Sequence, residues 1–368
     1  MIRKLLIGAG VAALAIWLVS GAFLLAGRAP RGAPPRGEAR GAWHVHTTRS
    51  DGRGTLAEIV AAARAAGLQF VVVTDHNVLT PEEQGWRDGV LVVEGTEAST
   101  AFGHVAALGV PRALTPEERE GDPLGAIAAL GGQAILAHPL HPRRPFTGWG
   151  RGAWRGLEVV SNDTAWGEVL RGRAWGKVAL AAAVFPFDGA RAVLALQGRA
   201  NEELRRFDAE LRAARRVDPR RPARVLLCSA DAHGYPSYGA AFAAFSMHLP
   251  LALTGNAAVD VPAVVAALTD GSAACVFDAV APAAGVRLVA QRAGRGIDLL
   301  LDAPDLAPAR FTLLRDGMPV AQGTASARSG PAVVSFVCEG ARCAPGDYRV
   351  EGTFDGRAWI FTNPIGIE

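Results

Sequence analysis

Two histidines separated by one residue, His44 and His46, follow a short apolar run near the start of the chain. In a β-strand, residues i and i+2 point to the same face and lie roughly 6.6 Å apart. Two imidazoles placed in this way can bind one metal ion, and Asp51, in the glycine-containing turn that follows, can add a carboxylate. A lone His-x-His pair is more often two ordinary polar residues, so metal binding depends on what the rest of the chain supplies.

Other histidines and carboxylates recur where strand-like runs begin or end. In chain order they are Asp75 and His76 after 70–74, Glu97 after 90–94, His104 before 105–110, His138 after 134–137, and Asp231 and His233 after 224–229. The carboxyl ends of barrel strands converge on one mouth, so these side chains are expected to meet there. Imidazole and carboxylate ligands suit Zn, Mn or Fe(II) without choosing among them. The pattern predicts a metal centre.

The elements that must position these residues are alternating strands and helices. Strand-like runs occur at 41–46, 70–74, 90–94, 134–137, 157–161, 224–229 and 242–248. Thr55 and Glu58 form a capping-box pattern at a helix start. About seven strands alternating with helices predict a parallel α/β barrel or a closely related fold. Residues 164–217 interrupt the alternation with predicted helices. Their apolar part, 178–197, is expected to be a helical insertion packed on the barrel, with an interfacial element lying on a bilayer as the alternative.

From residue 283 the apolar pattern changes to a period of two. The pairs Asp316-Gly317 and Asp355-Gly356 are favourable hairpin turns between short strands. Residues 283–368 are therefore predicted to form a small antiparallel, sandwich-like β domain.

The N-terminus has an uncharged stretch over 5–27. As a helix it would span about 35 Å, enough to cross a bilayer. We expect a retained signal anchor over 1–28 and a linker over 29–40, with a cleaved, secreted form as second choice. The chain would then be single-pass in the cytoplasmic membrane, with its catalytic domain on the periplasmic side.

The cysteines bear on the compartment. Cys338 and Cys343 are close enough in sequence for a local disulfide, which needs an oxidising compartment. Cys228 lies in an apolar strand and is interpreted as a buried free thiol, whereas Cys275 gives no signal.

The overall charge gives no indication of a nucleic-acid partner. The net charge is only +3, and the basic residues are nearly all arginine, with Lys4 and Lys177 the only lysines. No basic stripe with interleaved aromatic residues is present in the sequence.

The motifs resemble those of the PHP (polymerase and histidinol phosphatase) family of metal-dependent phosphoesterases. They are His44-Val45-His46 with Ser50-Asp51-Gly52, Thr74-Asp75-His76, Glu97 with His104, Ala137-His138-Pro139, and Asp231-Ala232-His233. The resemblance implies a distorted seven-stranded (β/α) barrel over 41–282 with up to three divalent ions. The implied ligands are His44, His46, Glu97 and Asp231 for one ion, Glu97, His104 and His138 for a second, and Asp51, His76 and His233 for a third.

The predicted function is hydrolysis of a phosphomonoester or small phosphodiester by metal-activated hydroxide. Asp75 is a candidate for orienting a ligand, and His141, Arg143 and Arg144 are candidates for binding phosphate or protonating the leaving group. One alternative is an amidohydrolase, which usually has a carbamylated lysine at a strand end, although Lys177 lies in an irregular region. The other is a non-catalytic, metal-binding surface module.

Overall fold

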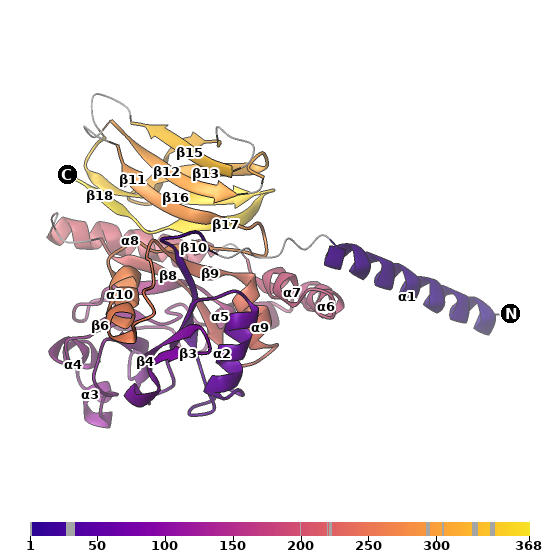
Figure 1. Cartoon of the computed structure of the whole chain (residues 1–368), viewed down its shortest axis with the longest axis horizontal. Helices are drawn as coiled ribbons and strands as arrows, with labels where there is room; N and C mark the ends of the chain where they lie inside the picture. The colour runs from indigo at the N-terminus through magenta and orange to yellow at the C-terminus, as the bar shows by residue number, and fades with distance from the viewer. Residues whose placement is uncertain are drawn as a thin grey trace.

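The computed structural model describes residues 2–26, 34–198, 200–218, 220, 223–291, 295–303, 305–325, 330–338 and 343–368. Figure 1 shows an N-terminal helix that extends away from a barrel, on which a layered β region is stacked.

The N-terminal helix α1 covers Ile2–Ala26. Its Trp17 Nε1 donates to the Ala183 carbonyl at 2.9 Å, and its ring centroid lies 4.8 Å from that of Phe187, so α1 touches the helical insertion. In the part of the chain that the structure describes, no helix is long and apolar enough to span a membrane. The predicted transmembrane segment is therefore not supported, and 27–33, with most of the predicted linker's first half, lie outside the described residues.

Seven strands close into a barrel. They are β1 (Ala39–Val45), β2 (Phe70–Val73), β4 (Val90–Thr100), β5 (Gly103–Leu108), β6 (Gln133–Leu136), β7 (Gly156–Ser161) and β8 (Val225–Ala232), paired in that order. The parallel pairing of β1 with β8 completes the closure. Most of these strands are buried at every position, as their nearly continuous apolar runs predicted. The predicted barrel class is confirmed.

One strand runs against the others. β5 is antiparallel to both neighbours, β4 and β6, because a tight connection at 101–102 leaves no room for a crossover helix. The barrel is therefore mixed, the related form of the expected parallel barrel rather than a parallel one throughout. The reversal also puts the first residues of β5, rather than its last, at the mouth where the carboxyl ends of the parallel strands meet.

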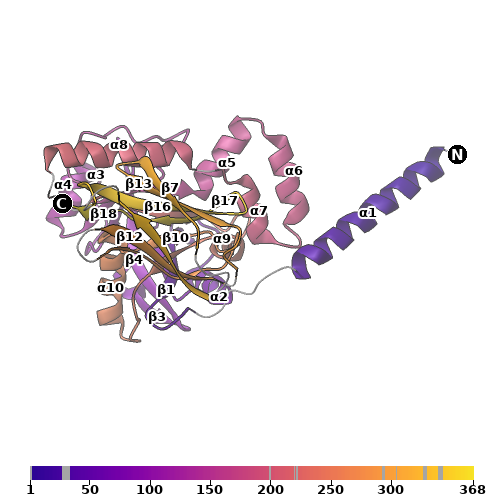
Figure 2. The same cartoon turned by 90° about the horizontal axis from the view of Figure 1, so that it is seen from above.

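Helices surround the barrel. α2 (Leu56–Ala65) follows β1 and begins with the predicted capping box at Thr55 and Glu58. The stretch between β2 and β4 holds a short 3-10 helix, Pro81–Glu83, and the edge strand β3 (Gly85–Arg87). The other helices are α3 (Pro116–Glu120), α4 (Pro123–Ala129), α5 (Asn162–Arg171), α6 (Trp175–Val184), α7 (Gly189–Leu196), α8 (Asn201–Val217), α9 (Tyr238–Ala244) and α10 (Ala257–Thr269). Helices α5 to α8 form the predicted insertion, and Figure 2 shows α8 lying along one side of the molecule. The strand expected over 242–248 begins only after α9 ends, as β9 (Ser246–Leu249).

The C-terminal part is a two-layered antiparallel β region. One layer is β11 (Ala284–Ala290), β12 (Gly296–Ala303) and β15 (Gly330–Val337). The other contains β13 (Ala309–Arg315), β14 (Met318–Gly323), β16 (Gly346–Phe354), β17 (Arg357–Thr362) and β18 (Ile365–Ile367). The predicted hairpin turns join β13 to β14 and β16 to β17, and Asp316 and Asp355 have positive φ there.

The barrel and the β region share a sheet. β10 (Ala274–Val276) pairs with β9 on one side and with β17 on the other, and β9 pairs in turn with β1. The buried Arg349 of β16 also contacts both carboxylate oxygens of Asp208 on α8, at 2.8 and 2.9 Å. The β region is thus joined, through β10 and β9, to the strand that leads into the His-x-His motif.

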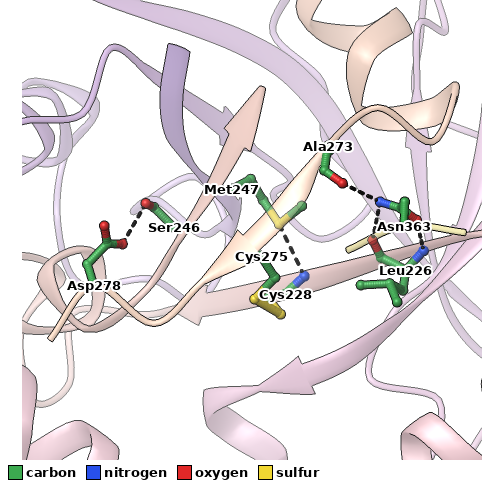
Figure 3. Close-up of a disulfide and its surroundings, with 8 residues drawn as sticks. All are labelled: Leu226, Cys228, Ser246, Met247, Ala273, Cys275, Asp278 and Asn363. Atoms are coloured by element: carbon green, nitrogen blue, oxygen red, sulfur yellow. Dashed lines mark hydrogen bonds between the residues drawn. A yellow bond between two sulfur atoms is a disulfide. The ribbon is translucent and has the colours of Figure 1, made fainter. Parts of the chain in front are cut away.

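Two disulfides are present. Cys338 and Cys343 are bonded, as the sequence predicted. Cys228 is buried as expected, but it is bonded to Cys275 rather than free (Figure 3). Their pairing could not be predicted because β8 and β10 approach only after the sheet has formed. Two disulfides indicate an extracytoplasmic environment.

Candidate metal centre

The barrel closure gathers the nine predicted ligands at one mouth. They come from β1 and the loop after it, the residues after β2, β4, the start of β5, the loop after β6, and the end of β8: His44, His46, Asp51, His76, Glu97, His104, His138, Asp231 and His233. His104 reaches the mouth because β5 is antiparallel and begins there. The spacing between Glu97 and His104 is accommodated by the hairpin that joins β4 and β5.

A bulge in β1 determines how the first motif is presented. The pairing registers of β1 with both β2 and β8 shift just before Val45. Ala42 and Val45 pack outward with α2, whereas Trp43 joins the inner core and His44 also points inward. A bulge of this kind re-aims side chains at the expense of one unpaired residue. The alternation therefore breaks between Trp43 and His44, immediately before the motif, and His44 and His46 still point to the same side.

Three of the candidate ligands have strained backbones. His44, His138 and Asp231 have φ of 68°, 28° and 39°. Non-glycine residues in this region cost on the order of 1–3 kcal/mol each and persist where the surroundings demand them. All three side chains point into the same cluster, so the strain coincides with the candidate site.

Glu97 is the centre of the cluster and is fully buried. Its Oε1 lies 2.8 Å from His104 Nδ1 and 2.9 Å from His138 Nε2. Its Oε2 lies 3.1–3.2 Å from His44 Nε2, His46 Nε2 and His76 Nδ1. Burial alone would raise the pKa of Glu97, but the imidazoles around it, His44 foremost, hold that pKa well below its usual range. One carboxylate thus faces five imidazoles from four segments of the chain.

The ligand atoms fall into four overlapping groups, in each of which they lie within 4.8 Å of one another. The groups are His46, Asp51, His76 and His233; His44, His46 and Asp231; His44, Glu97 and His138; and His76, Glu97 and His104. The predicted distribution placed His46 with only the first ion and His76 with only the third. In the structure each of these imidazoles also reaches a neighbouring group.

The donor set fits divalent metal ions. Nitrogen ligands bind zinc at about 2.0–2.1 Å, so ligand atoms around one tetrahedral ion lie about 3.4 Å apart. The Nδ1 atom of His138 is buried without a hydrogen-bond partner among the described residues. Burial would lower the pKa of His138, yet Glu97, Asp231 and Glu158 raise it to about 9. The cluster therefore attracts positive charge, whether a proton or a metal ion.

Glu158 on β7 belongs to the site, although its sequence context gave no signal. It is buried, and its Oε1 lies 2.6 Å from both Trp43 Nε1 and His44 Nδ1. Its Oε2 accepts the backbone N–H of His138 at 2.7 Å. A carboxylate on one imidazole nitrogen sets the tautomer, so that the other nitrogen is free to bind a metal. Only the closed barrel, in which β7 lies between β6 and β8, brings Glu158 to His44 and His138.

The role of Glu158 can be tested by removing its negative charge. Glu158→Gln should lower metal affinity about 10- to 100-fold, because the amide no longer fixes His44 with a negative charge. Titration with zinc against a competing chelator measures this directly. Glu210→Gln, which changes a carboxylate on α8 that pairs with Arg206 and Arg224, is the matched control. Equal affinity in the two variants would remove Glu158 from the site.

Asp75 positions the loop that leads to Asp51. It is buried, and its carboxylate accepts hydrogen bonds from the Thr47 backbone at 2.8 Å, the Ser50 hydroxyl at 2.5 Å and Arg49 Nε at 3.1 Å. These contacts tie the segment from Thr47 to Ser50, which leads to Asp51, to the residue after β2.

The predicted basic segment after His138 divides into buried and exposed parts. His141 is buried, with Nε2 3.0 Å from Asp163 Oδ2 and its ring centroid 5.4 Å from that of His138. Arg143 and Arg144 are exposed, and the Arg143 backbone N–H donates to His141 Nδ1. Of the three, His141 is the one that contacts the candidate ligands.

Comparison with known proteins gives structural likenesses only. No family model and no curated protein matches the chain. A two-domain protein from Bacteroides vulgatus, containing a domain inferred to be a PHP-like metal-dependent phosphoesterase, covers 92% of this chain and 100% of its own, with 12% identity and a TM-score of 0.43. A candidate metal-dependent phosphoesterase from Bifidobacterium adolescentis covers 35% of this chain and 79% of its own, with 18% identity and a TM-score of 0.25.

The third likeness is to an amidohydrolase from Chromobacterium violaceum with bound sulfate and no metal. It covers 36% of this chain and 84% of its own, with 17% identity and a TM-score of 0.27. Two of these three proteins are described as metal-dependent phosphoesterases. All three TM-scores are below 0.5, so the likenesses add nothing about chemistry to what the site itself shows.

Proposed function

We propose that this protein is a metal-dependent phosphoesterase of the PHP type that hydrolyses a phosphomonoester or a small phosphodiester. The observation that carries the proposal is Glu97, a fully buried carboxylate in contact with five imidazoles at the mouth of a closed barrel. A single structural ion needs only about four ligands. Nine convergent donors therefore support a centre of several ions, of which Zn, Mn and Fe(II) all suit the donor types.

The roles of the chain's own residues follow from their contacts. Divalent ions supply Lewis acidity: they lower the pKa of water and offset the charge of a phosphoryl group. In this proposal the nine ligands would hold two or three such ions, and Glu97, which belongs to two of the ligand groups, would be a ligand in both. Glu158 and Asp75 keep the ligands and the Asp51 loop in place. His141, held by Asp163 beside the cluster, is the proposed proton donor to the leaving oxygen, and the exposed Arg143 is the proposed contact for the substrate's phosphate.

The amidohydrolase alternative loses support. Its usual carbamylated lysine would have to be Lys4 or Lys177, the only lysines in the sequence. Lys4 belongs to α1, and Lys177 is exposed on α6, in the insertion outside the barrel.

We further propose that the protein works outside the cytoplasm, which the two disulfides support.

The deciding experiment combines metal analysis with turnover. Purified protein should contain more than one divalent ion per chain and should release p-nitrophenol from p-nitrophenyl phosphate. A chelator should abolish the activity, and Mn or Zn should restore it. Bis(p-nitrophenyl) phosphate tests the diester option in parallel. Less than one bound ion per chain, or metal-loaded protein without turnover of either ester, would contradict the proposal and favour a non-catalytic metal-binding module.

Substitution of Asp51 tests one ligand group separately from the others. Its side chain is 56% exposed and lies 3.3–3.5 Å from His46, His76 and His233. Asp51→Ala leaves this group with three neutral imidazoles and no charge compensation. We expect metal content to fall by about one ion per chain, kcat to fall more than KM, and the fold to remain intact because the residue is exposed.

Metal stoichiometry, kinetics and thermal melting should be measured beside Glu202→Ala, an exposed carboxylate on α8. If Asp51→Ala keeps the wild-type metal content and activity, the role given to Asp51 is wrong.

A further inference from the structure

An exposed aromatic residue lies two positions from one of the candidate ligands. Tyr235 comes two residues after His233 and is 64% exposed. Its ring centroid lies 5.8 Å from that of Trp166, with the rings tilted by 44°. The guanidinium carbon of Arg53 lies 5.7 Å from the Tyr235 centroid. We call these three side chains, Arg53, Tyr235 and Trp166, the rim group.

The first two members of the rim group are held against the metal centre. Arg53 follows Asp51 by two residues, and its backbone N–H donates to the His233 carbonyl at 3.0 Å. Gly234, between His233 and Tyr235, has φ of +83°, and a Cβ there would lie 3.2 Å from Arg53 Cβ. The two segments are therefore packed closely, next to the most exposed of the four ligand groups: His46, Asp51, His76 and His233.

The third member links the rim group to the other side of the mouth. Trp166 is half-buried on α5, one turn after Asp163. Asp163 contacts His141, whose ring lies beside that of His138. One face of α5 thus connects the exposed ligand group with the buried Glu97–His138 side, and the rim group lies along this border.

We propose that the rim group is a leaving-group subsite for phosphoesters whose alcohol carries a flat aromatic or heteroaromatic ring. A single exposed aromatic residue needs no explanation. Here, however, an exposed ring, a second aromatic ring and a guanidinium lie together next to candidate metal ligands, where the phosphoryl group of the substrate would be bound. Tyrosine and tryptophan faces stack on planar rings, and a guanidinium is attracted to a π-face. This inference rests on the proposed phosphoesterase function and deepens it.

A matched pair of substrates isolates the effect of a π-face. Benzyl phosphate and cyclohexylmethyl phosphate have alkyl leaving groups of similar size, and only the first has an aromatic ring. Kinetics of both should be measured on the full-length, metal-loaded protein. Binding of the two corresponding phosphonates, which are not hydrolysed, should be measured by calorimetry as a readout independent of turnover.

Tyr235→Ala should weaken benzylphosphonate binding and raise KM for benzyl phosphate about five- to tenfold. Both constants for the cyclohexylmethyl compounds should change by less than about twofold. Tyr235→Phe, which keeps the ring, should behave like wild type for both. Trp175→Ala removes an aromatic side chain that is 61% exposed on α6, away from the rim group, and should have no effect.

The outcomes separate the two proposals. If wild type hydrolyses both esters and Tyr235→Ala affects them equally or not at all, the subsite is wrong and the phosphoesterase function stands. If metal-loaded wild type neither binds the phosphonates nor hydrolyses the esters, both proposals fail. A selective loss for the benzyl compounds, restored in Tyr235→Phe, establishes the subsite.

Discussion

Glu97→Gln is expected to empty most of the metal centre and to lower kcat/KM by about a thousandfold. In the wild type this carboxylate is the only anion in contact with five imidazoles at once, among the residues that the structure describes. Glutamine has nearly the same shape but carries no charge, and its amide nitrogen cannot bind a metal ion. Losing Lewis-acid stabilisation of about 4 kcal/mol in the transition state corresponds to this factor.

The measurement is metal content together with kinetics, and the chain offers a matched control. Glu94 lies on the same strand, β4, and is also buried, but it pairs with Arg49 rather than with the histidine cluster. Glu94→Gln should therefore keep its metal ions. Thermal melting should show that both variants are folded. Full metal content in Glu97→Gln would overturn the shared-ligand role, and similar losses in both variants would point to a general loss of structure.

Removing the disulfide between Cys228 and Cys275 is expected to cost about 4 kcal/mol of stability. The two cysteines are 47 residues apart, and a cross-link of that length removes much of the chain entropy of the unfolded state. The bond joins β8, which carries Asp231, to β10 at the junction with the C-terminal β region. Figure 3 shows it among Met247, whose sulfur accepts the Cys228 backbone N–H, and Asn363, which bonds to Leu226 and Ala273.

The double variant Cys228→Ala/Cys275→Ala should melt about 10 °C below the wild type, from roughly 2–4 °C per kcal/mol in a domain of this size. Cys338→Ala/Cys343→Ala is the control, because its loop of 5 residues predicts only about 2 kcal/mol. Thiol titration of the unreduced, unfolded wild type should find no free cysteine. Free thiols, or equal melting temperatures in the two variants, would contradict the pairing or its energetic role.

Local patterns determined a large share of the site. His44 and His46, Asp75 and His76, and Asp231 and His233 were found because each follows a short apolar run that had to be a strand. The capping box at Thr55 and the turns at Asp316 and Asp355 also form as expected, since they depend on neighbours in the sequence. The Cys338–Cys343 bond belongs to the same class, because its partners are 5 residues apart.

The bulge at His44, the place of Glu158 and the Cys228–Cys275 bond were decided only by the tertiary structure. Each depends on which strands become neighbours, and pairing between distant strands leaves no local periodicity in either of them. Glu158 meets His44 across 114 residues, and only closure of the barrel brings them within 2.6 Å. The membrane span predicted from composition is not supported by the described part of α1. The sequence by itself therefore determined which residues are chemically suited to bind metal ions. Barrel closure decided how these residues are grouped and which side chains orient them.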